Sequence, residues 1–185
     1  MFIISDIIGF SFGGRTGIGL AARWPSLVNK LSITGVPLVR PVLGNLILQS
    51  WKESLQSQNP KAAAWSCIIN GCSAEFLTKY DKAVPELVDG ILRNNDTARM
   101  CDLITHATSP AAELITKEHA KQVKCPTQVI ASAGDRLAGM GSERQLAEAI
   151  EGSYFEEIDG ACGHMSPFEQ PVKWRNLTMS FLAGN

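Results

Sequence analysis

The chain has 185 residues, of which 45% are hydrophobic and 19% charged, a composition that is typical of one globular domain and excludes a disordered chain. The formal net charge is −1 and the basic residues are scattered, so neither a nucleic acid nor an anionic membrane is an expected partner. The five cysteines form no C-x-x-C pair, which argues against a disulfide framework and a zinc site. We therefore expect reduced thiols in an intracellular, cytoplasmic protein that uses no metal and no cofactor.

The N-terminal segment, residues 2–8, is apolar apart from Asp6 and is predicted to be a buried strand. It lacks the basic start of a signal peptide, and no run in the chain reaches the ~18 apolar residues of a membrane span. A helix is predicted for residues 11–24, ending before Pro25, and a short strand follows at residues 31–34.

In the middle of the chain, residues 39–121, apolar residues recur at helix spacing. Turn-forming residues interrupt the pattern at positions 59–60, 94–96 and 109–110. Four or five helices and no strand are predicted here.

Strand character returns in the last third of the chain, at residues 127–132 and again at 154–158. A helix is predicted between them at residues 142–150, where Ser142 begins a weak capping-box pattern, and a closing helix at 171–182. Strands that alternate with helices in this way predict an α/β fold with a mostly parallel sheet and helices on both faces.

Residues 9–13 form a G-x-S-x-G motif with Ser11 at its centre. The motif alone is weak, since it arises by chance in roughly 6% of chains this long. Its place between a predicted strand and a predicted helix is where a nucleophile elbow lies. Glycines beside Ser11 avoid clashes in such a turn, and the helix start would aim the backbone N–H of Phe12 at a developing oxyanion. The alternative is a glycine-rich turn with a structural serine.

A serine hydroxyl needs a base to take its proton, and that base needs an acid to orient it. Asp135 follows the predicted strand at 127–132, and His164 follows the one at 154–158. Both therefore lie past the carboxyl ends of strands, where parallel sheets gather their sites. A turn-forming aspartate and an ordinary loop histidine are the alternatives.

Three segments, IIGFSFGGRTGIGLAARWP, CPTQVIASAGDRL and DGACGHMSPFEQP, resemble the nucleophile, acid and histidine segments of the α/β-hydrolase superfamily. They are most similar to its esterase, aminopeptidase and C–C hydrolase branch. The resemblance implies the C-terminal part of an α/β-hydrolase fold, N-terminally truncated, with Ser11, Asp135 and His164 as the catalytic triad. It also implies a structural role for Glu169.

The resemblance further implies three regions. Residues 1–38 would hold the nucleophile strand, the elbow helix and the next strand of the core, residues 39–121 a helical cap, and residues 122–185 the C-terminal core with the acid and histidine loops. In such families the cap roofs the substrate pocket. Four aromatic residues of the cap could line an apolar pocket: Trp51, Trp65, Phe76 and Tyr80. Such residues more often form the core of a cap.

Members of this family have further strands and helices before the elbow, including the loop that supplies a second oxyanion N–H. Losing one such donor can cost about 10²–10³ in rate. The strand at residues 2–8 becomes an edge, which is open to self-association or to pairing with another chain. A truncated sequence, a second polypeptide that supplies the missing part and a true short form all remain open.

Serine rather than aspartate at position 11 favours acyl transfer. We therefore expect a serine hydrolase that acts on an ester-, thioester- or amide-type bond, or an activated C–C bond, of a small molecule. A non-catalytic interaction module that binds through its open edge is one alternative. An acyltransferase, in which an alcohol or amine replaces water, is another.

Overall fold

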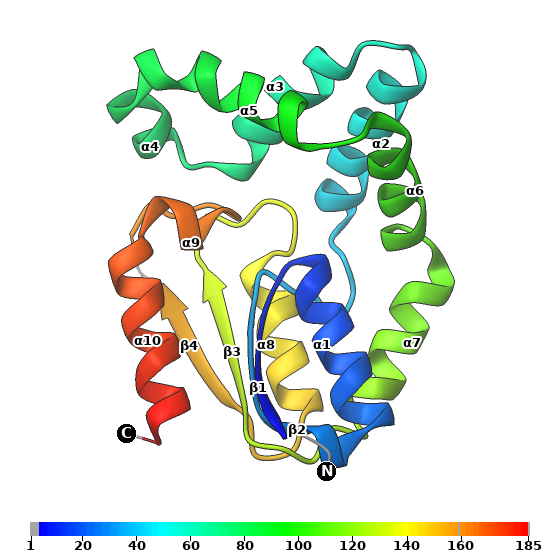
Figure 1. The fold of residues 1–185 in the computed structure, drawn as a ribbon, viewed down its shortest axis with the longest axis vertical. Coiled ribbons are helices and arrows are strands. Elements are labelled where there is room, and N and C mark those ends of the chain that lie inside the picture. Colours follow the sequence, from blue (N-terminus) through cyan, green and yellow to red (C-terminus); the bar gives the residue numbers. More distant parts are fainter. Residues whose placement is uncertain (1–3, 159, 185) are drawn as a thin grey trace.

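The computed structural model describes residues 4–158 and 160–184, and its centre is a parallel sheet of four strands in the order β1-β2-β3-β4 (Figure 1). All three neighbouring pairs are parallel, so the carboxyl ends of the strands meet at one edge of the sheet. The strands are β1 (Ser5–Phe10), β2 (Val28–Thr34), β3 (Thr127–Ser132) and β4 (Tyr154–Ile158).

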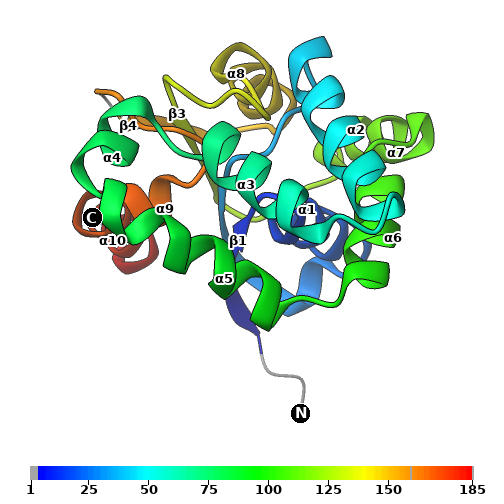
Figure 2. The same ribbon diagram turned by 90° about the horizontal axis from the view of Figure 1, so that it is seen from above.

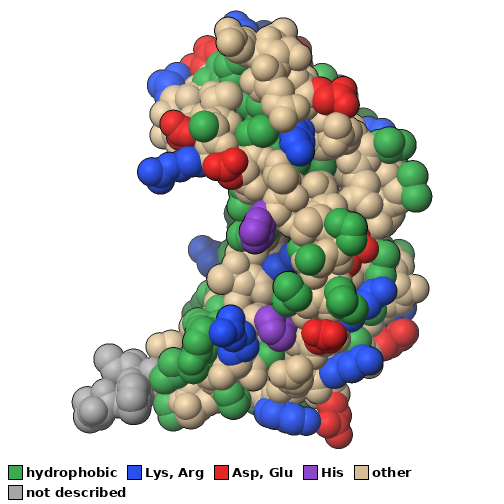
Figure 3. Space-filling model, turned by 90° about the vertical axis from the view of Figure 1, so that its right-hand side faces the viewer, with side chains coloured by type: hydrophobic (Ala, Val, Ile, Leu, Met, Phe, Trp, Pro, Cys, Tyr) green, Lys and Arg blue, Asp and Glu red, His purple; other side chains and the backbone are tan. Residues whose placement is uncertain are grey.

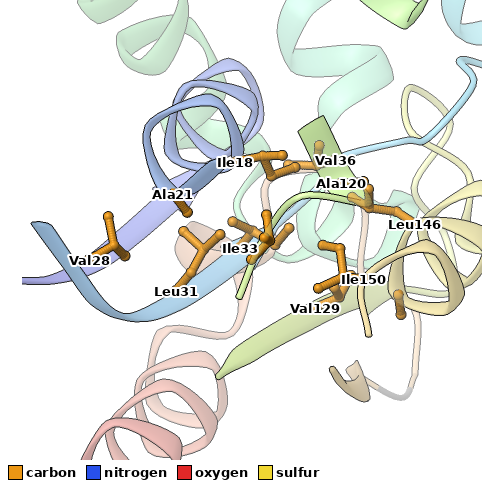
Figure 4. Packing of buried hydrophobic residues seen from close by; sticks show 12 residues of the cluster. Ile18, Ala21, Val28, Leu31, Ile33, Val36, Ala120, Val129, Leu146 and Ile150 are labelled. Atoms are coloured by element: carbon orange, nitrogen blue, oxygen red, sulfur yellow. The ribbon is translucent and has the colours of Figure 1, made fainter. Parts of the chain in front are cut away.

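Helices cover both faces of the sheet, which confirms the predicted fold class. One face carries α1 (Phe12–Arg23), α7 (Pro110–Ala120) and α8 (Met140–Ala149), whereas α10 (Pro171–Ala183) lies on the other (Figure 1). All six residues of β3 are buried, as expected for a central strand of a parallel sheet. The main hydrophobic core lies between the sheet and helices α1, α7 and α8 (Figure 4). Its members include Ile18, Leu31, Ile33, Val129, Leu146 and Ile150.

Helix α1 packs unusually close to the sheet. A Cβ atom at Gly17 would lie 2.9 Å from Cδ1 of Leu31, and one at Gly14 would overlap the side chain of Val36. These two glycines therefore allow the backbone of α1 to approach β2 directly. The close approach fixes where the first turn of α1 lies above the carboxyl ends of the strands.

The chain segment that joins β2 to β3 forms a layer of helices over the carboxyl ends of the strands (Figures 1 and 2). In the space-filling view, the molecule is hollowed between this layer and the sheet (Figure 3). The last helix of the segment, α7, instead packs beside α1 against the sheet. The helices of the overlying layer are α2 (Val42–Gln56), α3 (Pro60–Gly71), α4 (Ala74–Lys79), α5 (Val84–Asn94) and α6 (Thr97–Ala107).

The segment thus holds six α-helices, so the expected number of four or five was too low. The sequence pattern missed two breaks, one after α3 and one between α4 and α5. At the first, the Ser73 hydroxyl accepts a hydrogen bond from the Phe76 N–H (3.1 Å) and caps α4. Short 3-10 helices lie at Asp81–Ala83 and Pro25–Leu27, and a short helix α9 spans Ser166–Glu169.

The capping-box interpretation of Ser142 was wrong. Helix α8 begins at Met140, with Gly139 in a left-handed conformation (φ 74°) at its N-cap. The Ser142 hydroxyl instead donates to the carbonyl of Val39 and accepts from the Val39 N–H (3.0 Å). It therefore ties α8 to the chain that leaves β2.

Strand β1 forms the outer edge of the described sheet. It spans Ser5–Phe10 rather than 2–8, and residues 2 and 3 lie outside the described part of the chain. Ile4 and Ile8 are 61% and 48% exposed, so this edge is apolar. No helix among the described residues is long and apolar enough to cross a membrane.

Candidate active site

Ser11 lies in the tight turn between β1 and α1, with a positive φ of 51° that is rare for a residue with a side chain. Its N–H donates to the carbonyl of Thr34 (2.8 Å), and its carbonyl accepts from the N–H groups of Gly14 (3.0 Å) and Arg15 (3.2 Å). A Cβ atom at Gly9 would lie 2.6 Å from the Gly14 Cα atom, so the turn requires glycine there. A strained backbone of this kind costs about 1–3 kcal/mol and persists only where the surrounding structure holds it. The turn itself lifts the serine hydroxyl clear of the sheet.

The structure brings Ser11, His164 and Asp135 into one chain of hydrogen bonds. Nε2 of His164 lies 3.0 Å from the Ser11 hydroxyl, and Nδ1 lies 2.7 Å from an oxygen of Asp135. A carboxylate can only accept, so the imidazole proton belongs on Nδ1 and the lone pair of Nε2 faces the serine. This arrangement suits a base that takes the serine proton.

Asp135 is buried, and its second oxygen accepts from the N–H groups of Leu137 and Ala138, both at 2.8 Å. Burial acts to raise the pKa of Asp135, but the charge and hydrogen bond of His164 and these two N–H groups outweigh it. The pKa is therefore lowered, and the carboxylate stays charged to orient His164.

The loop that carries His164 is held on several sides. Glu169 accepts from the Gly163 N–H (2.9 Å) with one oxygen and from the N–H (3.0 Å) and hydroxyl (2.5 Å) of Ser73 with the other. A Cβ atom at Gly35 would lie 2.9 Å from Cε1 of His164, so only glycine leaves room for the ring. The contacts of Glu169 support the structural role expected for it.

A cavity of about 270 Å³ opens beside Ser11 and His164, under the helices of the overlying layer. Among the four expected aromatic residues, Trp51 lines it. Trp65 packs in the core of the helical layer, and Phe76 and Tyr80 stack on each other beside a separate hollow. The apolar residues that join Trp51 in the wall include Leu48, Ile68, Leu103, Ile104 and Met165.

Two buried ionisable groups near the site were not singled out in the sequence analysis. Arg40, 9% exposed, lines the cavity, and Glu143 on α8 is fully buried. Burial and then the charge of Asp135 raise the pKa of Glu143 well above its usual range. The nearby backbone N–H groups of Gly35, Ser132 and Val36 act to lower it but are outweighed. These N–H groups form no hydrogen bond of normal geometry with the oxygens of Glu143.

Thiols and metal-binding side chains are the remaining reactive groups. The five cysteines are free, and burial raises the pKa of Cys67, which lines the cavity, to about 12. Within residues 4–158 and 160–184, no group of three or more His, Cys, Asp or Glu side chains is placed to hold a metal ion.

Solved structures with the same arrangement of helices and strands identify the fold. MGS-M2, an α/β-hydrolase enzyme from a Medee basin deep-sea metagenome library, aligns with a TM-score of 0.86 and 22% identity over 98% of this chain and 66% of its own. The chain has the α/β-hydrolase fold. The enol-lactonase from Burkholderia xenovorans LB400 aligns with a TM-score of 0.81 and 21% identity, over 98% of this chain and 66% of its own. These alignments are consistent with the predicted C-terminal part of an α/β-hydrolase.

Two curated proteins are also similar to this chain. Pyrrolizixenacetamide deacetylase of Xenorhabdus hominickii is 23% identical over 96% of the chain and 65% of its own length. A 2-hydroxy-6-oxononadienedioate/2-hydroxy-6-oxononatrienedioate hydrolase of Paraburkholderia phymatum is 21% identical over 96% of the chain and 62% of its own. The chain thus spans less than two thirds of either relative, and no family model matches it.

Proposed function

We propose that this chain carries the active site of a serine hydrolase that cleaves an ester-, thioester- or amide-type bond of a small molecule. The observation that supports this most directly is the hydrogen-bonded chain from Asp135 through His164 to Ser11, at the mouth of an apolar cavity. A purely structural role for Ser11 would not explain why it lies in a strained turn with its hydroxyl against a buried histidine.

In the first half of the reaction, the Ser11 hydroxyl oxygen attacks the carbonyl carbon of the substrate while Nε2 of His164 takes its proton. The oxygen of the tetrahedral intermediate then carries the negative charge, and the Phe12 N–H at the start of α1 is the donor we assign to it. The intermediate collapses when the bond to the leaving group breaks, and His164 protonates that group. The acyl group remains on Ser11.

In the second half, water attacks the acyl carbon while His164 takes a proton from it. The bond to Ser11 breaks, the serine oxygen regains its proton from His164, and the acid product leaves. Asp135 stays ionised throughout and keeps Nδ1 of His164 protonated and correctly oriented. The complete cycle returns the triad to its starting protonation state.

The helices between β2 and β3 would act as the cap of this site. Apolar side chains from α2, α3 and α6 line the cavity, which favours an apolar acyl or leaving group and keeps water from the reacting atoms. The relatives described above are a deacetylase, an enol-lactonase and a hydrolase, and reactions of these kinds suit the same acyl-transfer chemistry.

A fluorophosphonate probe tests the proposal directly, because it phosphonylates only an activated serine and releases fluoride. Intact-mass measurement of the wild-type chain should show one adduct, and peptide mapping should place it on Ser11. Ser11→Ala should abolish the adduct, and His164→Gln should slow its formation strongly while circular dichroism shows an unchanged fold. A folded wild-type chain that forms no adduct, or an adduct that survives in Ser11→Ala, would refute the proposal.

A further inference from the structure

Arg40 brings a permanent charge into an otherwise apolar cavity. It lies on the segment between β2 and α2 and lines the same cavity as Ser11 and His164. Among the described residues of that wall it is the only one with a permanent charge, since the others apart from Ser11 and His164 are apolar or glycine. A charged group at 9% exposure loses most of its hydration and needs a partner.

The contacts of the Arg40 guanidinium leave it incompletely satisfied. Nη1 donates to the carbonyl of Leu137 (3.3 Å), whereas Nε is buried without a hydrogen-bond partner. Glu113 accepts from the backbone N–H of Arg40 (3.0 Å), and its carboxylate forms no ion pair with the guanidinium. Unpaired buried charges of this kind are costly, and a ligand that supplied an acceptor would reduce that cost.

A second arginine, Arg15, lies close enough to influence Arg40, although it lines a neighbouring hollow and not this cavity. Nη1 of Arg15 donates to the carbonyl of Ala107 (3.1 Å), and its Nε and Nη2 are buried without partners. Burial first, and then the nearby charge of Arg15, lower the pKa of Arg40 to about 10, with Asp135 and Glu113 acting in the opposite direction. Arg40 is therefore cationic at neutral pH.

We propose that the substrate of this site carries a carboxylate that accepts hydrogen bonds from Arg40, joined to an apolar body that lies against Trp51, Ile68 and Leu103. The inference rests on the proposed function, to which it adds the class of substrate. An anionic group would supply the partner that the guanidinium lacks, and the apolar wall excludes competing water. In the opposing view, Arg40 is a structural residue that Glu113 and Asp135 neutralise from a distance.

Binding of a matched pair of ligands separates the two views. Phenylbutyrate and phenylbutanol share an apolar body and differ in the charged group, and neither is a substrate for hydrolysis. Calorimetry or Trp51 fluorescence should show that the carboxylate binds the wild-type chain about tenfold or more tightly than the alcohol. Equal binding of the two ligands, or no binding of either, would overturn the proposal.

Variants locate the preference. In Arg40→Gln the advantage of the carboxylate should disappear, whereas Arg93→Gln, which removes an exposed arginine paired with Glu86, should retain it. A preference that survives in Arg40→Gln would also overturn the proposal. If Arg40→Gln fails to fold by circular dichroism, Arg40→Lys keeps the charge without the planar fork and should show a reduced preference, and an unchanged one would count against Arg40.

The fluorophosphonate experiment keeps the two proposals apart. Labelling of Ser11 without any carboxylate preference would overturn the inference about Arg40 and leave the hydrolase proposal standing. A carboxylate preference in a chain whose Ser11 never reacts would support an anionic ligand and refute the hydrolase.

Discussion

The buried carboxyl of Glu143 makes the stability of this protein depend on pH in a predictable direction. Its side chain is fully buried beneath the carboxyl ends of β2 and β3, and its two oxygens have no hydrogen-bond partner. Burial and the Asp135 carboxylate both disfavour its charged form and raise its pKa. Glu143→Gln removes the ionisable group while keeping nearly the same shape, so the two chains should diverge in stability as the pH changes.

The sign follows from proton linkage. Below about pH 4.5, the ordinary pKa, Glu143 is protonated in both the folded and the unfolded chain and contributes no pH dependence. Above it, the unfolded chain loses the proton and the folded chain keeps it, so folding becomes less favourable as the pH rises. The loss accumulates at up to about 1.4 kcal/mol per pH unit until the pH reaches the raised pKa of the folded state. The variant escapes this loss.

Urea unfolding at a series of pH values between about pH 5 and pH 8 measures the effect. The free energy of unfolding of Glu143→Gln, minus that of the wild type, should increase with pH at a rate of up to about 1.4 kcal/mol per pH unit. Glu148→Gln makes the same chemical change at an exposed position of the same helix and serves as the control. A difference for Glu143→Gln that stays constant with pH would refute the assignment of a buried, protonated carboxyl.

Three further changes probe the site and its support. Asp135→Asn should lower the rate of fluorophosphonate labelling by about 10³–10⁴-fold with the fold intact, because an amide in place of the carboxylate favours the wrong tautomer of His164; stopped-flow or timed mass measurements would detect it. Gly14→Ala should destabilise the chain by about 1–3 kcal/mol in urea unfolding, because the added methyl overlaps the Val36 side chain where α1 approaches the sheet. Cys67 should resist iodoacetamide at neutral pH, since its pKa of about 12 leaves almost no thiolate; rapid modification mapped to this residue by mass spectrometry would contradict that expectation.

Local sequence patterns placed the three residues at the ends of strands, and the resemblance to α/β-hydrolases then favoured them over the structural alternatives. Ser11 lies in a glycine-flanked turn, and Asp135 and His164 each follow a strand, so their convergence required only that the strands be parallel and neighbouring. Parallel pairing follows from alternating strands and helices, and it brings the ends of distant strands together. The strands at Thr127–Ser132 and Tyr154–Ile158 were predicted with their observed bounds.

The buried charges were harder to predict, because arginine and glutamate are ordinarily exposed. A signal for Glu143 did exist: it lies three, four and seven residues before Leu146, Ala147 and Ile150, which places it on the apolar face of α8. Arg40 offered no such signal, since it lies in an irregular segment whose burial depends on the helices packed above it. The placement of Trp51 in the cavity wall likewise depends on how α2 is rotated against its neighbours, which periodicity alone does not fix.

Glu169 links the loop that carries His164 to the start of α4. One carboxylate oxygen holds the backbone beside His164, and the other holds Ser73 at the start of α4. The backbone N–H of Met165 adds a second tie, to the carbonyl of Gly71 at the end of α3 (2.9 Å). The α3–α4 junction is therefore linked to the loop of His164 by two sets of hydrogen bonds. If the proposed function holds, a substitution at this junction should change the rate of fluorophosphonate labelling of Ser11, although neither Glu169 nor Gly71 contacts the serine.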